Sequence, residues 1–446
     1  MLADPVAHSP SVAPSPSVSP RPSRGLRATL LLLFVALVCL RMPAILGQGR
    51  LWAEEGIFYQ NAWSLQPWRA ALLDYGGYLN LVANTAALLA RYTVPLEAAP
   101  WIMTGVGMLF QLCPAVLIVT SLVAWLRTPL AIAACLFALA AAPIAEETWL
   151  QTLHSQYHLT LCVALILAFD DCPSPAIVWF RRVLLLLAPL CGVLAALLAP
   201  LLILRALFDR SRERTVQCGL LLLGAALQLG LFYSSAGGAA LGRSTVFWPG
   251  IILDAIVVRH IIIPIFGLDI GARAGANIRA ALAAHATPVW PALAFALSLG
   301  ALAFICLRRW RTSAPWLLTS ALGLAAVSYY AAIDGGPNFL DVNLAQRYSF
   351  VPQVILVWTL VCVAATPPFG WIAKAAAAAT LWLLLVAAVL LPRSASTQFA
   401  NGPAWREEIR LWQQDPSHHI RLWPKDWGMS LNPDHTPAPV AGRLRD

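Results

Sequence analysis

Long runs of apolar residues, separated by short polar segments, recur along the whole chain. A helix needs about 20 predominantly apolar residues to cross a bilayer. Runs close to this length occupy residues 28–46, 98–126, 129–145, 150–169, 182–208, 215–233, 280–306, 314–331, 348–365 and 371–391. Arginines flank the run at 182–208 on both sides, so we expect it to turn back between Cys191 and Pro200 as a helical hairpin. The pattern predicts an all-α, polytopic transmembrane helical bundle of about eleven spans (roughly 9–13).

Two further apolar stretches, 78–94 and 246–266, contain polar residues. Counting either as a full crossing would move the clusters of basic residues to the outer side of the membrane, against the positive-inside rule. We therefore expect re-entrant or interfacial helices beside a cavity, because such backbone at membrane depth needs protein or water around it.

Composition supports the same class of protein. The 446 residues are 59% hydrophobic and only 11% charged, and the mean hydropathy is +0.70. The formal net charge of +9 does not indicate a nucleic-acid partner, because the basic residues form short clusters between apolar runs. The nine cysteines include no CxxC pair, so no disulfide or zinc framework is expected.

Three regions follow from this pattern. Residues 1–27 are rich in Pro and Ser and predict a disordered cytoplasmic tail. Residues 28–392 form the membrane domain, with a first outer loop at 47–97, and residues 393–446 form an aromatic-rich tail on the outer face. Abundant alanine and only two lysines, Lys374 and Lys425, suggest a GC-rich bacterial genome and hence the inner (plasma) membrane.

Two adjacent carboxylates follow the first apolar run, in the segment LWAEEGIFYQNAW at 51–63. Adjacent side chains on a helix point about 100° apart, so either Glu54 or Glu55 could face a cavity. If both acids were solvated, they would only mark the point where the chain leaves the first span. The aromatic residues around Glu54 and Glu55, with Tyr78 of the YGGYLN segment at 75–80, instead predict that the carboxyl groups are buried. Burial raises a carboxyl pKa toward the range of a general base.

This acidic pair, in the first outward loop of a many-helix chain, resembles the GT-C superfamily of integral-membrane glycosyltransferases. The specific motif is short, AEEG at 53–56, with Glu at both positions where many members carry Asp. The resemblance implies a GT-C-like fold and transfer of a sugar from a polyprenyl-phosphate donor to a cell-surface glycan, lipid or protein on the outer face. It also implies that a loop acid is the base or a metal ligand. We expect Glu55 to be the base and Glu54 a second acid or the ligand of a divalent metal, whose requirement is left open.

A lipid-phosphate leaving group needs a cation. Arg347, in RYSFVP at 347–352, suits bidentate phosphate contact, and its position resembles the late outer-face arginine of the GT-C family. The alternative is an arginine that snorkels at a span end. Arg243, Arg259 and His260 are weaker candidates for the phosphate contact.

The segment EETWLQTLHSQYHL at 146–159 contains a second polar set. Glu147, Gln151, His154 and His158 are spaced so that all four would share one helix face. We expect this stripe, together with Tyr78, to line the donor or acceptor cavity; interhelical hydrogen bonding and direct metal or phosphate binding are the alternatives for the stripe. The HxxxH pattern lacks the glutamate of HExxH, which disfavours a metallopeptidase.

The tail after Pro392 contains Trp405, Trp412, Trp423 and Trp427, and the tetrapeptide IRLW occurs in it twice. Its helical spacing predicts an amphipathic segment that anchors on the outer leaflet, or alternatively a lid over the donor site.

Two other functions remain open. A transporter or flippase of lipid-linked sugars would also contain polar residues and broken helices, but near the bilayer midplane between related halves. Here the polar residues gather at the predicted outer ends, and the sequence does not contain two related halves. A polymerase or ligase of surface polysaccharide usually has large arginine-rich outer loops, whereas the loops of this chain are modest.

Overall fold

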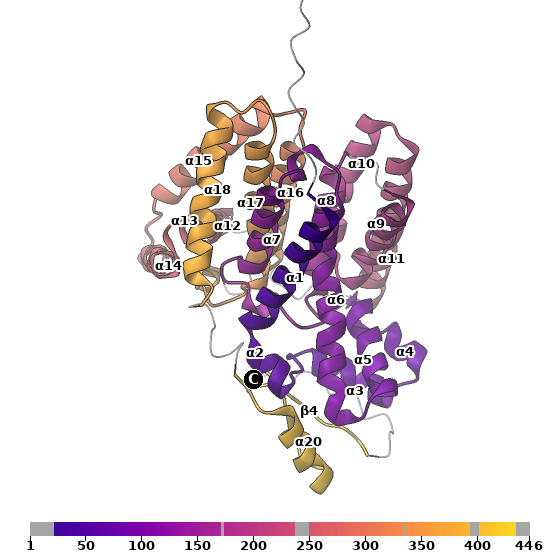
Figure 1. Cartoon of the computed structure of the whole chain (residues 1–446). Coiled ribbons are helices and arrows are strands. Elements are labelled where there is room, and N and C mark those ends of the chain that lie inside the picture. Colours follow the sequence, from indigo (N-terminus) through magenta and orange to yellow (C-terminus); the bar gives the residue numbers. More distant parts are fainter. Residues whose placement is uncertain (1–21, 171–173, 237–248, 333–335, 393–400, 434–446) are drawn as a thin grey trace, which may run out of the picture.

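The computed structural model of the chain describes residues 22–170, 174–236, 249–332, 336–392 and 401–433. It is 76% helical and all-α in class. One end of the molecule, which we call the α3 end, is built from short helices (Figure 1). These helices are α2 (Pro43–Gln48), α3 (Glu55–Ser64), α4 (Pro67–Ala71), α5 (Leu81–Thr93) and α20 (Trp405–Gln414).

Among the described residues, six helices are long and apolar enough to cross a membrane. They are α6 (Ala99–Thr120), α11 (Arg212–Ala236), the continuous helix Pro249–Phe266, α15 (Trp290–Arg308), α17 (Arg347–Ala365) and α18 (Trp371–Leu390). Two further apolar helices, α7 (Pro129–Ala141) and α8 (Ser155–Ala168), are shorter. The six long helices mark an integral membrane protein, whereas the count of eleven spans stays a prediction.

The first helix, α1, spans Arg24–Arg41 and has arginines at both ends of its apolar run. The Ser23 side chain accepts the Leu26 N–H, which caps the helix. Residues 24–27, which the sequence placed in a disordered tail, are therefore the first turn of α1. Residues 1–21 of that expected tail lie outside the described part of the chain.

The hairpin expected at 182–208 is present as α9 (Pro175–Leu187) and α10 (Ala199–Asp209). Two 3-10 turns, η4 (Pro189–Cys191) and η5 (Val193–Leu198), join them, and both helices pack against α11. Between the turns, Gly192 has a φ of 152°, and the Gln156 side chain fills the space that a Cβ would need. The close approach of α8 to this turn therefore requires glycine.

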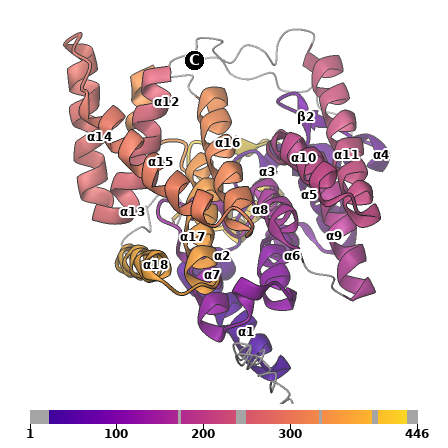
Figure 2. The same cartoon turned by 90° about the horizontal axis from the view of Figure 1, so that it is seen from above.

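The described part of the stretch 246–266 is one helix, made of α12 (Pro249–Ile256), a π-helical segment (Val257–Ile262) and α13 (Ile263–Phe266). It was expected to be re-entrant or interfacial, but it is long and apolar enough to cross a membrane. The next helix, α14 (Leu268–Ala283), is seen end-on where α18 is seen along its length, and the reverse holds from above (Figures 1 and 2). α14 thus crosses the direction of α18. The expected span at 280–306 is in fact divided, because its first residues end α14 and α15 begins at Trp290.

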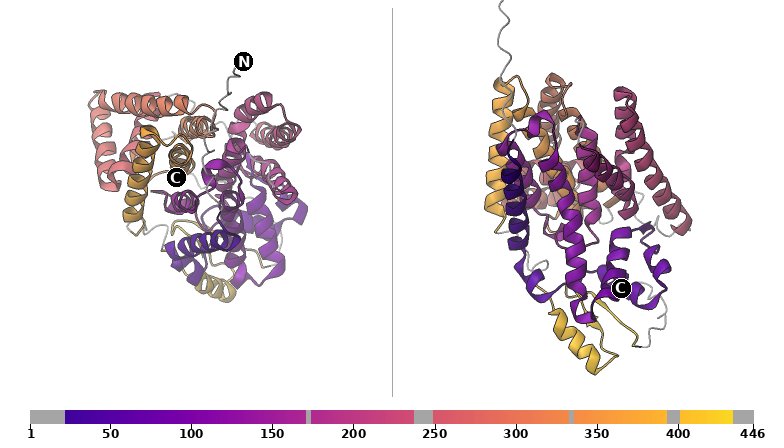
Figure 3. Two further views of the ribbon diagram at one scale, coloured as in Figure 1. Left: turned by 45° about the horizontal axis from the view of Figure 1, so that its top comes forward. Right: turned by 45° about the vertical axis from the view of Figure 1, so that its right-hand side comes forward.

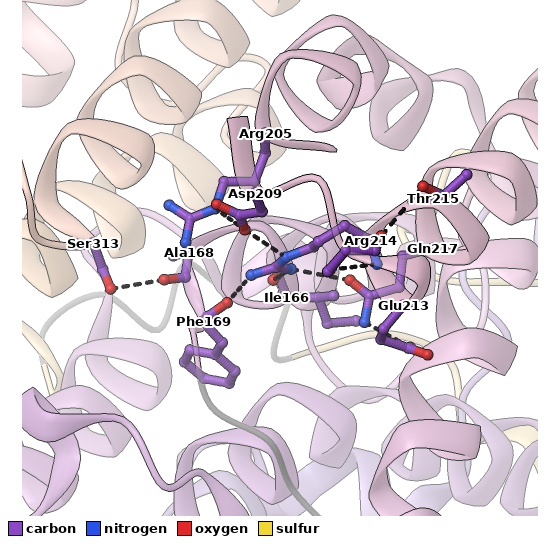
Figure 4. Close-up of polar contacts among 11 residues, drawn as sticks. Ile166, Ala168, Phe169, Arg205, Asp209, Glu213, Arg214, Thr215, Gln217 and Ser313 are labelled. Atoms are coloured by element: carbon purple, nitrogen blue, oxygen red, sulfur yellow. Dashed lines mark hydrogen bonds and ion pairs between the residues drawn. The ribbon is translucent and has the colours of Figure 1, made fainter. Parts of the chain in front are cut away.

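α8 is the most enclosed helix, with all of its residues buried. It packs against α6, α17 and α16 (Ala314–Ala332). The last carbonyls of a helix lack partners within it, and here side chains of other helices supply them. Arg214 donates to the carbonyls of Ile166 (2.8 Å) and Phe169, and the Ser313 hydroxyl donates to that of Ala168 (2.7 Å) (Figure 4). These contacts fix the end of α8 that points away from the α3 end.

The segment between α1 and α6 folds at the α3 end together with the C-terminal segment (Figure 3). It contains a hairpin of β1 (Asp74–Tyr75) and β2 (Tyr78–Leu79) before α5, and η1 (Leu96–Ala98) after it. The expected interfacial helix at 78–94 therefore begins as a strand. The C-terminal segment adds α20 and a second antiparallel pair, β3 (Ile420–Arg421) with β4 (Gly428–Met429).

Candidate active site

A pocket of about 1000 Å³, counting the space open to solvent, lies at the α3 end. Four segments bring polar side chains to its wall: the turn before α3, the β1–β2 hairpin, the start of α8 and the start of α17. The polar side chains with ionisable groups are Glu54, Tyr75, Tyr78, His154, Tyr157, Arg347 and Tyr348. Residues of η5 and α16, all apolar except Ser328, also line the pocket.

The hairpin places two tyrosines in the wall because of its turn. Gly76 and Gly77 have φ values of 63° and 85°, as a two-residue hairpin turn of type I′ requires. Tyr75 and Tyr78 are the opposed residues next to this turn, so their side chains lie on the same face of the hairpin.

The two adjacent glutamates have different surroundings. Glu55 is buried, and its carboxylate accepts hydrogen bonds from the Trp52 N–H (2.8 Å), the Thr152 N–H (2.7 Å) and the Thr152 hydroxyl (2.6 Å). Burial raises the pKa of Glu55, while these bonds and the charge of Arg50 oppose the shift. Glu55 therefore ties the start of α3 to the segment before α8, and only Glu54 of the pair lines the pocket.

Glu54 is half-buried at the N-terminal boundary of α3. Burial raises the pKa of its carboxyl, and the nearby carboxylates Glu147 and Glu55 add to the shift, whereas Arg347 opposes it. A carboxylate with a raised pKa in an open pocket has the properties of a general base.

Arg347, which lines the pocket, forms an ion pair with Glu147, which does not line it. Its side chain donates to the Glu147 carboxylate, and its backbone N–H lies 3.4 Å from the second carboxylate oxygen. Burial disfavours the charge on Glu147, but Arg347 outweighs it and holds the pKa of this carboxyl below its usual value. The Arg347 side chain remains 33% exposed. Because a guanidinium has five N–H donors, it can bind an additional anion in the pocket.

The expected helical stripe at 147–158 is wrong in its geometry. Glu147 belongs to a 3-10 turn, η3 (Glu146–Thr148), the backbone then extends, and α8 begins only at Ser155. Leu150, with a φ of 56°, cannot continue a helix. Of the four residues only His154 lines the pocket, beside the Arg347–Glu147 pair.

Gln151 and His158 of that stripe face the protein interior. Gln151 donates to the Glu147 carbonyl, and His158 packs between Trp149 and Phe350 with ring centroids 4.9 and 5.0 Å away. The His154 ring lies 2.7 Å from the Glu147 carbonyl oxygen, and burial lowers the pKa of His154 to about 4. This histidine is therefore neutral at physiological pH.

Two of the weaker phosphate candidates, Arg259 and His260, do not line the pocket. The Arg259 guanidinium is buried and donates to the carbonyls of Phe339 (3.0 Å), Asp341 (2.7 Å) and Leu344 (2.6 Å). It holds the connection before α17 and is occupied by these bonds. His260 contacts the Tyr329 hydroxyl at 2.7 Å and lines a separate apolar pocket between α7, α13, α17 and α18. Arg243 lies outside the described residues.

Sequence reasoning missed several residues of the site. Thr152, which engages Glu55, and the pocket residues Tyr157 and Tyr348 carry no motif. Tyr75 could have been found, because the Gly-Gly turn makes it the partner of Tyr78.

Comparison with known proteins gives no assignment, since no family model, curated protein or solved structure matches the chain. Within the described ranges, no group of three or more His, Cys, Asp or Glu side chains is placed to hold a metal ion.

Proposed function

We propose that the protein is a membrane glycosyltransferase with a GT-C-like architecture, in which Glu54 is the base and Arg347 binds the phosphate of a polyprenyl-phosphate sugar. One observation carries the proposal: a carboxylate with a raised pKa and a partly exposed arginine line the same pocket. Glu54 takes the role of base that was expected for Glu55, because the hydrogen bonds of Glu55 leave it no access to a substrate and make it a structural residue.

The reaction needs few groups. Glu54 takes the proton of an acceptor hydroxyl while that oxygen attacks the anomeric carbon. The bond from the anomeric carbon to the phosphate oxygen breaks, and the phosphate leaves with its electron pair, stabilised by Arg347. Attack from the side opposite the phosphate inverts the anomeric centre. The acceptor is a hydroxyl of a cell-surface glycan, lipid or protein.

Arginine positions support an orientation with the pocket on the outer face. Arg210 and Arg212 lie where α10 meets α11, and Arg308, Arg309 and Arg311 where α15 meets α16. Both connections are at the end of the bundle opposite to α3 and α20 (Figure 1). The positive-inside rule places that end in the cytoplasm. The pocket would then open to the periplasm or exterior of a bacterial inner membrane.

Sugar transfer by the purified protein tests the proposal. The substrates are radiolabelled polyprenyl-phosphate sugars and a cell-envelope extract as acceptor, and wild type is compared with Glu54→Gln. Glu407→Gln is the matched control, because Glu407 is an exposed carboxylate on α20 outside the pocket. Loss of a general base lowers transfer by about 10²–10⁴-fold, and the control should keep the wild-type rate.

Two outcomes would contradict the proposal. Wild-type transfer by Glu54→Gln removes the base assignment. Movement of lipid-linked sugar across vesicles by wild-type protein, with no transfer to any acceptor, replaces the enzyme with a transporter.

A further inference from the structure

The C-terminal segment, residues 401–433, contacts the turn before α3 that carries Glu54. The Trp423 N–H donates to the Leu51 carbonyl (3.2 Å), and the Trp423 carbonyl accepts the Ala53 N–H (2.5 Å), so Trp423 pairs with Trp52 as a one-residue parallel bridge. The residues that line the pocket all lie between Glu54 and Tyr348. Of the described part of this segment, residues 401–433, Trp423 thus holds the turn, and no residue lines the pocket as a lid would.

The turn needs such support because its backbone is unusual. Ala53 has a φ of 36°, in the left-handed region that residues with a Cβ rarely adopt. Such a conformation persists only where its surroundings hold it. Glu55 holds the turn on the membrane-domain side through Thr152, and Trp423 holds it on the other side.

Side chains tighten the same contact. Gly56, in the first turn of α3, leaves space that is filled by the Leu422 side chain, and a Cβ at this position would collide with it. Arg50 lies over the rings of both Trp52 (5.2 Å) and Trp423 (5.8 Å). The turn and the C-terminal segment are therefore complementary in shape at Gly56 and Leu422.

The C-terminal segment is itself fixed to the rest of the α3 end. The Trp405 indole donates to the Leu96 carbonyl (2.9 Å), and the Trp63 indole of α3 donates to the Asn432 carbonyl (2.8 Å). Within the segment, the buried Glu408 carboxylate accepts from the Arg421 backbone N–H and side chain, which joins α20 to β3. Leu422 and Trp423 therefore follow an anchored strand.

We propose that Leu422 and Trp423 are positioning residues that set the placement of Glu54 in the pocket. The role of Glu54 as base rests on the proposed function, but its placement is measurable without any sugar transfer.

A compensating pair of substitutions tests the contact in the full-length protein. Gly56→Ala pushes against Leu422, and Leu422→Ala removes the side chain that supports the turn. In the double variant the new methyl group meets the vacated space, and alanine is a better helix residue than glycine. Arg410→Ala is the control, because Arg410 pairs with Glu407 on the exposed face of α20.

The first readout is the rate of carbodiimide labelling of Glu54 against pH, followed by peptide mass spectrometry. The charged groups close to Glu54 are Arg347, Glu147 and Glu55, and none of them is altered in these variants. We expect each single variant to admit water and shift the labelling midpoint downward, toward the ordinary glutamate value of about 4.3. The double variant should return toward the wild-type midpoint, and Arg410→Ala should match wild type.

The second readout is transfer, where a displaced base should lower kcat by about 10²-fold in the single variants with little change in KM. Unchanged midpoints in the single variants overturn the positioning role, as does a double variant that remains folded without recovering. If the midpoints shift as expected but no form of the protein transfers sugar, the positioning stands and the proposed function fails.

Discussion

Replacing Thr152 by valine isolates the structural role of Glu55. The substitution keeps the shape of the side chain and removes one donor, the hydroxyl 2.6 Å from the Glu55 carboxylate. Hydrogen bonds to charged groups contribute about 1.5–3 kcal/mol to stability. The Trp52 and Thr152 N–H groups still engage the carboxylate, so we expect the free energy of unfolding to fall by about 1.5–3 kcal/mol.

The comparison variant is Thr160→Val, because Thr160 is equally buried but its hydroxyl bonds the Gln156 carbonyl of its own helix (2.7 Å). Such a bond within a helix contributes little, and the expected loss is under about 1 kcal/mol. Thermal unfolding midpoints in detergent, with matched protein and lipid content, measure the difference. Folded Thr152→Val protein should keep its transfer rate, since Thr152 does not line the pocket.

The loss of unfolding free energy in Thr152→Val should depend on pH in a defined direction. The hydroxyl donates to the ionised form of Glu55, and burial raises the pKa of this carboxyl. The difference in unfolding free energy between Thr152→Val and wild type should have its full value above that pKa and should shrink as the pH falls through it. Equal midpoints for the two threonine variants, or a difference that is the same at every pH, would refute the role given to Glu55.

Three further results are expected. Glu147→Gln leaves Arg347 without its carboxylate, which should lower the free energy of unfolding by about 1–3 kcal/mol; inorganic phosphate should raise the unfolding midpoint of this variant more than that of wild type, and an equal effect would contradict anion binding by Arg347. His154→Gln should leave the acid limb of the transfer rate where it is, because burial already keeps the pKa of His154 at about 4; a moved limb in a pH profile would assign the titration to His154 and not to Glu54. Arg347 supplies the positive charge of the pocket, so we expect EDTA to leave transfer unchanged; loss on chelation with recovery on added Mg²⁺ or Mn²⁺ would restore Glu54 as a metal ligand.

Much of the fold follows from periodicity and flanking charge alone. The arginines on both sides of 182–208 predicted a hairpin, and α9 and α10 form it with a connection that begins at Pro189, just before the expected range, and ends within that range at Leu198. Apolar length predicted a membrane protein correctly because hydrocarbon imposes this requirement on each helix separately. The break between α14 and α15 was missed, since alanine-rich sequence continues across it.

The candidate site was harder to predict because its decisive contacts are distant in sequence. Glu54 and Glu55 are alike in local pattern, and Thr152, 97 residues away, determines which of them faces the pocket. Likewise, the helical spacing of Glu147 and His154 was sound as a pattern, but the backbone at Leu150 does not continue a helix. The two residues still approach, since the His154 ring bonds the Glu147 carbonyl.

The charges of the pocket lead to one more expectation about the pH profile. With His154 neutral, the charged groups that line the pocket are the Glu54 carboxylate and the Arg347 guanidinium, which also pairs with Glu147. A phosphate bound to Arg347 adds negative charge near Glu54 and offsets the cation that now opposes protonation of this carboxyl. Donor binding should therefore raise the pKa of Glu54 further. Because the base must be ionised to act, the acid limb of kcat should lie at higher pH than the acid limb of kcat/KM for the donor. Limbs at the same pH, in wild-type protein with saturating acceptor, would mean that Arg347 and Glu54 do not share the phosphate-binding site.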